Sequence, residues 1–162
     1  MDLSSVIRRG HPAAFSLLII WALIVGIISS AVVADFNKEG HQPRDLVRDS
    51  TRFMVFTGWW TFLLSIIYLV LFITGIGGFL SSIASHAIFV FITWVFWLSG
   101  SAALSNAVGG GSCYNTRDCG SLKAIVAFGW IAWIELTFLL GVICYLGVKA
   151  FRGGRGVQES LA

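Results

Sequence analysis

The residues with the most scope for chemistry are few, and they lie in or beside long apolar stretches. Glu135 is the one acidic residue near the middle of such a stretch, where a carboxylate is costly unless it is protonated or paired. A proton or cation relay chains several such groups, and His86 is the only other residue that qualifies. We therefore favour a protonated structural carboxyl that donates a hydrogen bond to a hydroxyl or backbone carbonyl, over an ion-handling site. Counting residues from the end of each apolar stretch gives the depth of a residue in the membrane. The residues expected at a depth comparable to that of Glu135 are Ser65, Tyr68, Thr93 and Trp94.

The three cysteines offer a second kind of chemistry. Cys113 and Cys119 lie in the segment GGGSCYNTRDCG, with five residues between them, and this spacing allows a disulfide in an oxidising compartment. Two free thiols are an alternative, and a metal site is another, although Asp118 is the only further ligand nearby and about four are needed. Cys144 lies inside an apolar stretch and is interpreted as a small apolar residue, with palmitoylation as the alternative.

The composition indicates an integral membrane protein. Hydrophobic residues make up 57% of the 162 residues and charged residues only 12%, about half of the charged share in a soluble domain. The sequence contains none of the common hydrolase, zinc-protease or phosphate-binding motifs, and no long basic run for nucleic acid. We therefore expect no enzyme, no cofactor, no metal and no nucleic-acid partner.

Four long apolar runs each have the length of a membrane-spanning helix, which takes about 20 residues. Continuous runs of this kind favour helices over the alternating strands of a membrane barrel. The sequence thus predicts an all-α bundle of four transmembrane helices in a domain of residues 13–149, between tails at 1–12 and 150–162. The expected spans are 13–34, 53–75, 79–104 and 124–147.

Orientation is less strongly marked than the spans. Four spans place both termini on one side, but basic residues are nearly equal in number on the two sides. Acidic residues neutralise the first connecting loop, whereas both tails are net positive, and a disulfide between Cys113 and Cys119 would face away from the cytosol. We therefore expect cytosolic termini in the plasma membrane or a membrane of the secretory pathway.

Small residues at every fourth position indicate faces for close helix packing. In membranes, such seams let two backbones approach each other. The first span carries Ala22, Gly26, Ser30 and Ala34, and the third carries Ser99 and Ala103, continued by Ala107. We expect the first and third spans to cross each other at these seams, or the seams to join copies of the chain.

The layout of spans and loops resembles that of a known family. The third-span segment HAIFVFITWVFWLSGSAALSNA, the loop CYNTRDC and the segment AIVAFGWIAWIELTFLLGV are similar to the MARVEL-domain tetraspan family, especially to its fungal members of the non-classical-export group. Only Cys113 and Cys119 match by position. The resemblance implies cytosolic termini, organisation of membrane microdomains or apposed membranes, and association with lipid or sterol without catalysis.

Two functional hypotheses follow from these observations. The first is a membrane-organising tetraspan that packs with copies of itself, with lipids or with other integral membrane proteins. The second is a small transporter or channel, or an accessory subunit of a membrane complex, that uses Glu135. A continuous polar stripe would support the second hypothesis. We find no aligned polar face in the spans, and therefore favour the first.

Overall fold

The computed structural model describes residues 3–38, 44–74, 83–109 and 118–152 of the chain. Within these ranges the secondary structure is α-helical throughout, which confirms the predicted all-α fold. The four helices are α1 (Leu3–Lys38), α2 (Asp45–Thr74), α3 (Ile83–Gly109) and α4 (Cys119–Arg152).

Each helix contains a stretch long and apolar enough to cross a bilayer. These stretches have 25 to 27 residues, more than the roughly 20 that the bilayer core requires. They are Pro12–Lys38, Asp45–Leu71, Ser85–Gly109 and Cys119–Tyr145. The protein is therefore a multi-pass membrane protein.

The helix α2 begins well before the span predicted at 53–75. Its first turns are polar, and Arg48 pairs there with Asp45 at 3.1 Å and with Asp49 at 3.2 Å. The pair of Arg48 with Asp45, one turn earlier, supports a helix outside the apolar layer. The span expected at 53–75 is the apolar part of this helix, and α2 continues before it as a polar extension.

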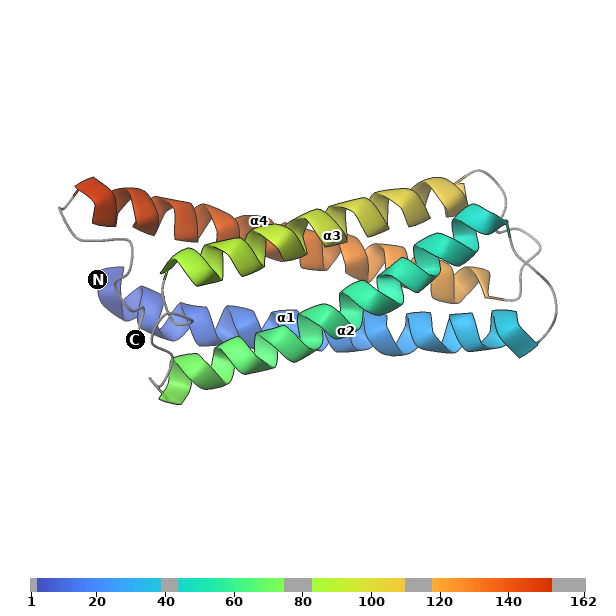
Figure 1. Cartoon of the computed structure of the whole chain (residues 1–162), viewed down its shortest axis with the longest axis horizontal. Coiled ribbons are helices and arrows are strands. Elements are labelled where there is room, and N and C mark those ends of the chain that lie inside the picture. The colour runs from blue at the N-terminus through green and yellow to red at the C-terminus, as the bar shows by residue number, and fades with distance from the viewer. Residues whose placement is uncertain (1–2, 39–43, 75–82, 110–117, 153–162) are drawn as a thin grey trace.

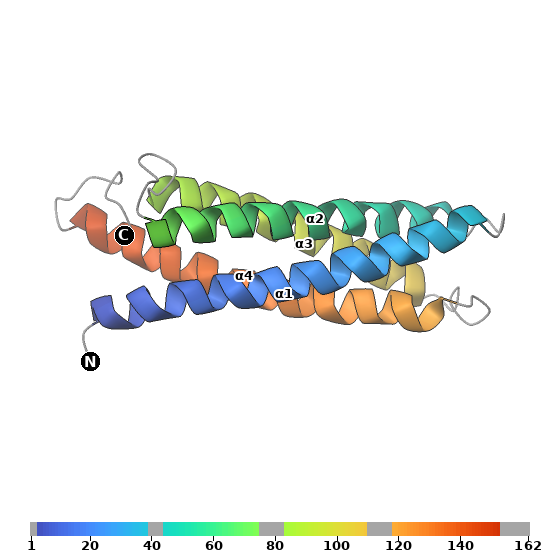
Figure 2. The ribbon, with the colours of Figure 1, turned by 90° about the horizontal axis from the view of Figure 1, so that it is seen from below.

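The helices run alternately up and down, so that α1 begins and α4 ends at the same end of the bundle (Figures 1 and 2). The helix α1 packs against α2 and α4, and α3 packs against the same two helices. The predicted crossing of the first and third spans is therefore wrong. Consecutive antiparallel helices become neighbours in a bundle of this kind, which leaves α1 and α3 on a diagonal.

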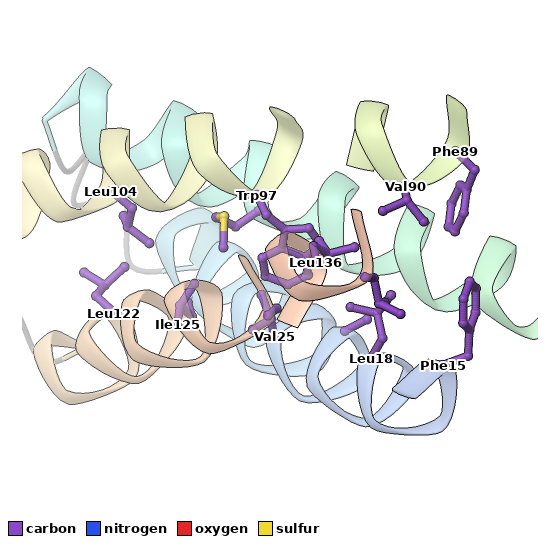
Figure 3. Close-up of a cluster of buried hydrophobic side chains, with 14 of the residues drawn as sticks. Phe15, Leu18, Val25, Phe89, Val90, Trp97, Leu104, Leu122, Ile125 and Leu136 are labelled. Carbon is purple, nitrogen blue, oxygen red and sulfur yellow. The ribbon is translucent and has the colours of Figure 1, made fainter. Parts of the chain in front are cut away.

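Large apolar side chains fill the axis of the bundle in successive layers (Figure 3). Leu104 of α3 and Leu122 of α4 face each other near one end. Trp97 is fully buried near the middle, and Phe15 and Phe89 approach each other toward the other end, with ring centroids 6.4 Å apart. The core thus joins all four helices along most of their length.

The outer surface is apolar as well. Every helix exposes large hydrophobic side chains, of which Phe138 on α4 is the most exposed at 73%. Representatives on the other helices are Ile27, Leu63 and Phe91. An apolar surface of this extent is unfavourable in water, and it is typical of a helix bundle that is surrounded by lipid.

Candidate functional site

The carboxyl of Glu135 lies on the side of α4 that faces α1. Phe128, two turns earlier on the same flank, stacks on Trp21 of α1 with ring centroids 5.7 Å apart. The Trp21 side chain is hydrogen-bonded to Glu135. Because an indole N–H can only donate, the carboxyl accepts this bond.

This geometry corrects two expectations about Glu135. From the sequence we expected neighbours on the second and third spans and a carboxyl that donates a hydrogen bond. The observed partner is instead the indole of Trp21 on α1, which donates to the carboxyl. The second oxygen, Oε2, is buried and has no hydrogen-bond partner among the described residues. The carboxyl is thus anchored through one oxygen only.

His86 belongs to a different cluster. It is fully buried, and its ring meets those of Tyr68 and Phe15 edge-on, with centroids 4.7 Å and 6.0 Å away. The Tyr68 hydroxyl also lies 2.7 Å from the Ser85 hydroxyl. The ring neighbours of His86 and the hydrogen-bond partner of Glu135 are therefore different residues. The described residues contain no group of three or more His, Cys, Asp or Glu that could hold a metal ion.

Hydrogen bonds from tryptophan indoles connect neighbouring helices throughout the bundle. Six of the seven tryptophans donate to a neighbouring helix: Trp21 to Glu135, and the rest to Ser or Thr hydroxyls. These five bonds are Trp59 to Ser30 (3.2 Å), Trp60 to Thr93 (3.4 Å), Trp94 to Thr137 (2.9 Å), Trp97 to Thr61 (3.0 Å) and Trp130 to Ser105 (3.0 Å). Each neighbouring pair of helices therefore shares at least one such bond.

The sequence pattern does not indicate these bonds between helices. The indole N–H of the seventh tryptophan, Trp133, is buried and has no partner among the described residues. Trp133 instead packs its ring against Trp94 and Trp130, at centroid distances of 5.7 Å and 5.5 Å. The only signal for the indole hydrogen bonds in the sequence was the joint presence of Trp, Ser and Thr residues within the predicted spans.

The predicted seam of the first span lies mainly against α2. Ala22 and Gly26 are buried, Ser30 is half-buried and Ala34 is exposed. The partner surface is Gly58, because a Cβ added there would lie 2.8 Å from both the Cα and the N atom of Gly26. The two backbones touch at this point, as small residues allow.

Trp59 follows Gly58 and donates to Ser30, one turn beyond Gly26. These four residues form the contact that we call the N-terminal clasp: Gly26 and Ser30 on α1 with Gly58 and Trp59 on α2. The clasp joins the first two helices both by backbone contact and by a hydrogen bond.

The helices α3 and α4 make a similar contact, in which a serine side chain rather than a backbone lies against the glycine. Ser101 and Ser105 of α3 are also four residues apart, and Gly129 and Trp130 of α4 are also consecutive. A Cβ added at Gly129 would lie 2.5 Å from Ser101 Oγ, and Trp130 donates to Ser105 at 3.0 Å. We call this the C-terminal clasp. The repeated Gly-Trp pair in the second and fourth spans was the signal for it in the sequence.

The predicted seam of the third span lies partly outside the contacts. Ser99 is exposed and Ala103 is half-buried, while Ala107 is buried. The close approach of α3 to α2 occurs instead at Gly100, where an added Cβ would lie 2.5 Å from Met54 Sδ. The packing face is thus rotated from the one that the small-residue pattern suggested.

The described residues also include an aligned polar face, contrary to the expectation from the sequence. Thr57, Thr61 and Ser65 recur every fourth residue along α2, and all three are fully buried. We call these three residues the hydroxyl stripe. Periodicity of hydropathy did not reveal it because Thr and Ser occur on several faces of the spans.

The predicted disulfide stays a prediction. Cys119 opens α4, but Cys113 lies outside the described residues. Cys144 is a free thiol exposed on the outer surface of α4, where it does not join any other cysteine of the described ranges.

Comparison with known proteins agrees with this architecture. The family model for MARVEL, described as a membrane-associating domain, matches residues 6–146. No curated protein and no solved structure matches the chain. Because the matched region includes most of the residues of all four helices, the chain belongs to the MARVEL family of membrane-associating domains.

Proposed function

We propose that this protein is a non-catalytic organiser of membranes, which acts by packing laterally with lipids, with copies of itself or with other integral membrane proteins. The observation that carries the proposal is the outer surface: large apolar side chains are exposed on all four helices, around a core that indole hydrogen bonds hold together. A bundle with such a surface presents lipid-facing contacts on every side. Its family is membrane-associating, which supports the same role.

The proposed setting is the plasma membrane or a membrane of the secretory pathway, with both termini in the cytosol. The even number of helices supports a common side for the termini. Sterol is one lipid that the proposal includes, since flat rigid ligands suit a surface that alternates bulky and small side chains. On α4 this surface includes Phe138, Gly141 and Tyr145.

The experiment is extraction of the full chain with its surrounding membrane into polymer-bounded native discs. Native mass spectrometry then counts the copies per disc, and lipid analysis compares the disc with the membrane of origin. We expect more than one protein copy per disc, or lipids enriched over the parent membrane. Single copies in discs of unaltered lipid composition would contradict the proposal.

A second candidate function rests on one specific observation. The buried Oε2 of Glu135 has no hydrogen-bond partner among the described residues, so this oxygen is available to a proton or another ligand. This observation supports a small transporter, or an accessory subunit of one. The hydroxyl stripe of α2 is the kind of aligned polar face that such a function would use, but it carries no ionisable residue, and the contacts of Glu135 and of His86 are to different residues. The organiser is therefore the better-supported function.

A further inference from the structure

The hydroxyl stripe of α2 has an unusual hydrogen-bonding state. Thr61 accepts the indole N–H of Trp97 at 3.0 Å. Thr57 Oγ1 and Ser65 Oγ, one turn to either side, are buried and have no hydrogen-bond partner within the described part of the chain. Burying a hydroxyl without a partner costs free energy, and such groups in native proteins call for an explanation.

Other buried hydroxyls of the bundle avoid this cost by bonding to the carbonyl one turn earlier. Ser29 donates to the carbonyl of Val25 at 2.6 Å, and Thr51 donates to that of Val47 at 2.7 Å. Thr51 lies on α2 itself, so the helix permits this arrangement. Thr57 and Ser65 do not adopt it.

The C-terminal hairpin, formed by α3 and α4, shows that the fold does not require hydroxyls at the positions of the hydroxyl stripe. The two clasps align Gly58 of α2 with Gly129 of α4. When α2 and α4 are aligned at these two glycines, the three positions of the hydroxyl stripe are occupied in α4, in the same order, by Phe128, Ala132 and Leu136. Ala132 and Leu136 are fully buried, as Thr61 and Ser65 are. One hairpin thus meets the packing requirement with apolar side chains, and the other carries polar groups there.

We propose that the hydroxyl stripe binds water inside the membrane, with one site at Thr57 and a second at Ser65. Water fits because a hydroxyl can both donate and accept, and because a buried water satisfies polar groups that lack other partners. The fully buried polar residues that the structure describes are hydroxyl-bearing apart from His86, so a charged ligand would find no counter-charge.

The two sites are separate. Thr57 and Ser65 lie eight residues apart, which is about 12 Å along a helix. Between them Thr61 is engaged by Trp97, whose fully buried ring lies in the middle of the core near Val25 and Leu136 (Figure 3). In this conformation the indole of Trp97 divides the hydrated stripe into two parts.

A third partnerless hydroxyl, Ser101 Oγ, does not belong to the proposal. Ser101 Oγ has no hydrogen-bond partner among the described residues, and it would lie 2.5 Å from a Cβ added at Gly129. The Met54 side chain also packs against Gly129. Protein atoms already occupy the space on that side of Ser101, so no water is assigned to it.

The first test is the sign of a change in stability. Thr57→Val keeps the shape of the side chain and removes the hydroxyl. If the hydroxyl binds water, the variant leaves that water short of a partner, and we expect the thermal midpoint of the protein in lipid nanodiscs to fall. If the hydroxyl is dry, removing it relieves an unsatisfied group, and the midpoint will stay the same or rise, which would overturn the proposal.

A second test detects the water directly and does not depend on the variant folding. In the unaltered full chain, with Thr and Ala methyl groups labelled, magnetisation transfer from water to methyl groups is measured by NMR in nanodiscs. We expect transfer to the Thr57 methyl to exceed transfer to the Ala132 methyl, its fully buried control on α4. Equal and negligible transfer to both would refute hydration of the stripe.

Discussion

The contact between Gly58 and Gly26 predicts a large penalty for a small substitution. In Gly58→Ala the new Cβ would lie 2.8 Å from two backbone atoms of Gly26 and 3.1 Å from the carbonyl oxygen of Ala22. Ordinary contact begins at 3.4 Å, so the backbones of α1 and α2 must separate by more than half an ångström. Backbone atoms cannot rotate out of the way as the end of a side chain can.

The magnitude follows from three effects. Overpacking of a well-packed interface costs about 1–3 kcal/mol. Separation of the helices also lengthens the bond from Trp59 to Ser30, already 3.2 Å, and intramembrane hydrogen bonds contribute about 0.6 kcal/mol on average. Alanine favours a helix over glycine by about 1 kcal/mol, which offsets part of the loss. We therefore expect a net destabilisation of about 1–2 kcal/mol.

Two matched variants complete the experiment. Gly141→Ala is the control, because an added Cβ there meets nothing within 4 Å. Gly129→Ala should be intermediate, since its close neighbours are the side chains of Ser101 and Met54, which can shift. The assay is reversible unfolding in mixed micelles with increasing dodecyl sulfate. If Gly58→Ala proves as stable as Gly141→Ala, the backbone contact between α1 and α2 is not a determinant of stability.

Three further predictions address the indoles, Glu135 and the cysteines. Trp97→Phe should destabilise the bundle by about 1 kcal/mol more than Trp133→Phe, because only Trp97 donates a hydrogen bond; equal losses in the same unfolding assay would count against the role of these bonds. Glu135→Gln should keep an acceptor for the α1 indole and leave stability nearly unchanged, whereas Glu135→Leu should cost about 1 kcal/mol; vesicle flux that is present in the parent and lost in the Gln variant would instead favour the transporter. Cys113 and Cys119 should resist an impermeant thiol reagent on intact cells until reductant is added, and labelling of both beforehand would refute the disulfide.

The sequence was sufficient for the spans but not for the packing between them. Four apolar runs predict four helices because a bilayer requires that length and composition. Which face of each helix turns inward is much harder to predict, because lipid and protein core are about equally apolar. This explains why the predicted seam included the exposed Ser99 and missed the contact of Ser101 with Gly129.

The partner of Glu135 was missed for a related reason. Counting residues from the helix ends identifies residues at the same depth in the membrane on every helix. It does not identify which helices are neighbours. Trp21 contacts Glu135 only because α1 packs beside α4, and that adjacency comes from the topology of the bundle. The aligned hydroxyls of α2 were equally hidden until the inward face of the helix was known.

The difference between the two hairpins bears on how the chain selects one arrangement. Both clasps contain a Gly-Trp pair and one indole bond, so these two features do not distinguish α2 from α4. Their other inward groups do: Thr61 of α2 accepts an indole from α3, whereas Glu135 of α4 accepts one from α1. Apolar packing alone discriminates weakly between partners in lipid, and hydrogen bonds that pair specific donors and acceptors discriminate better. We therefore expect the polar groups inside this bundle to select which hairpin faces meet, while the apolar exterior remains available to lipids and to other membrane proteins.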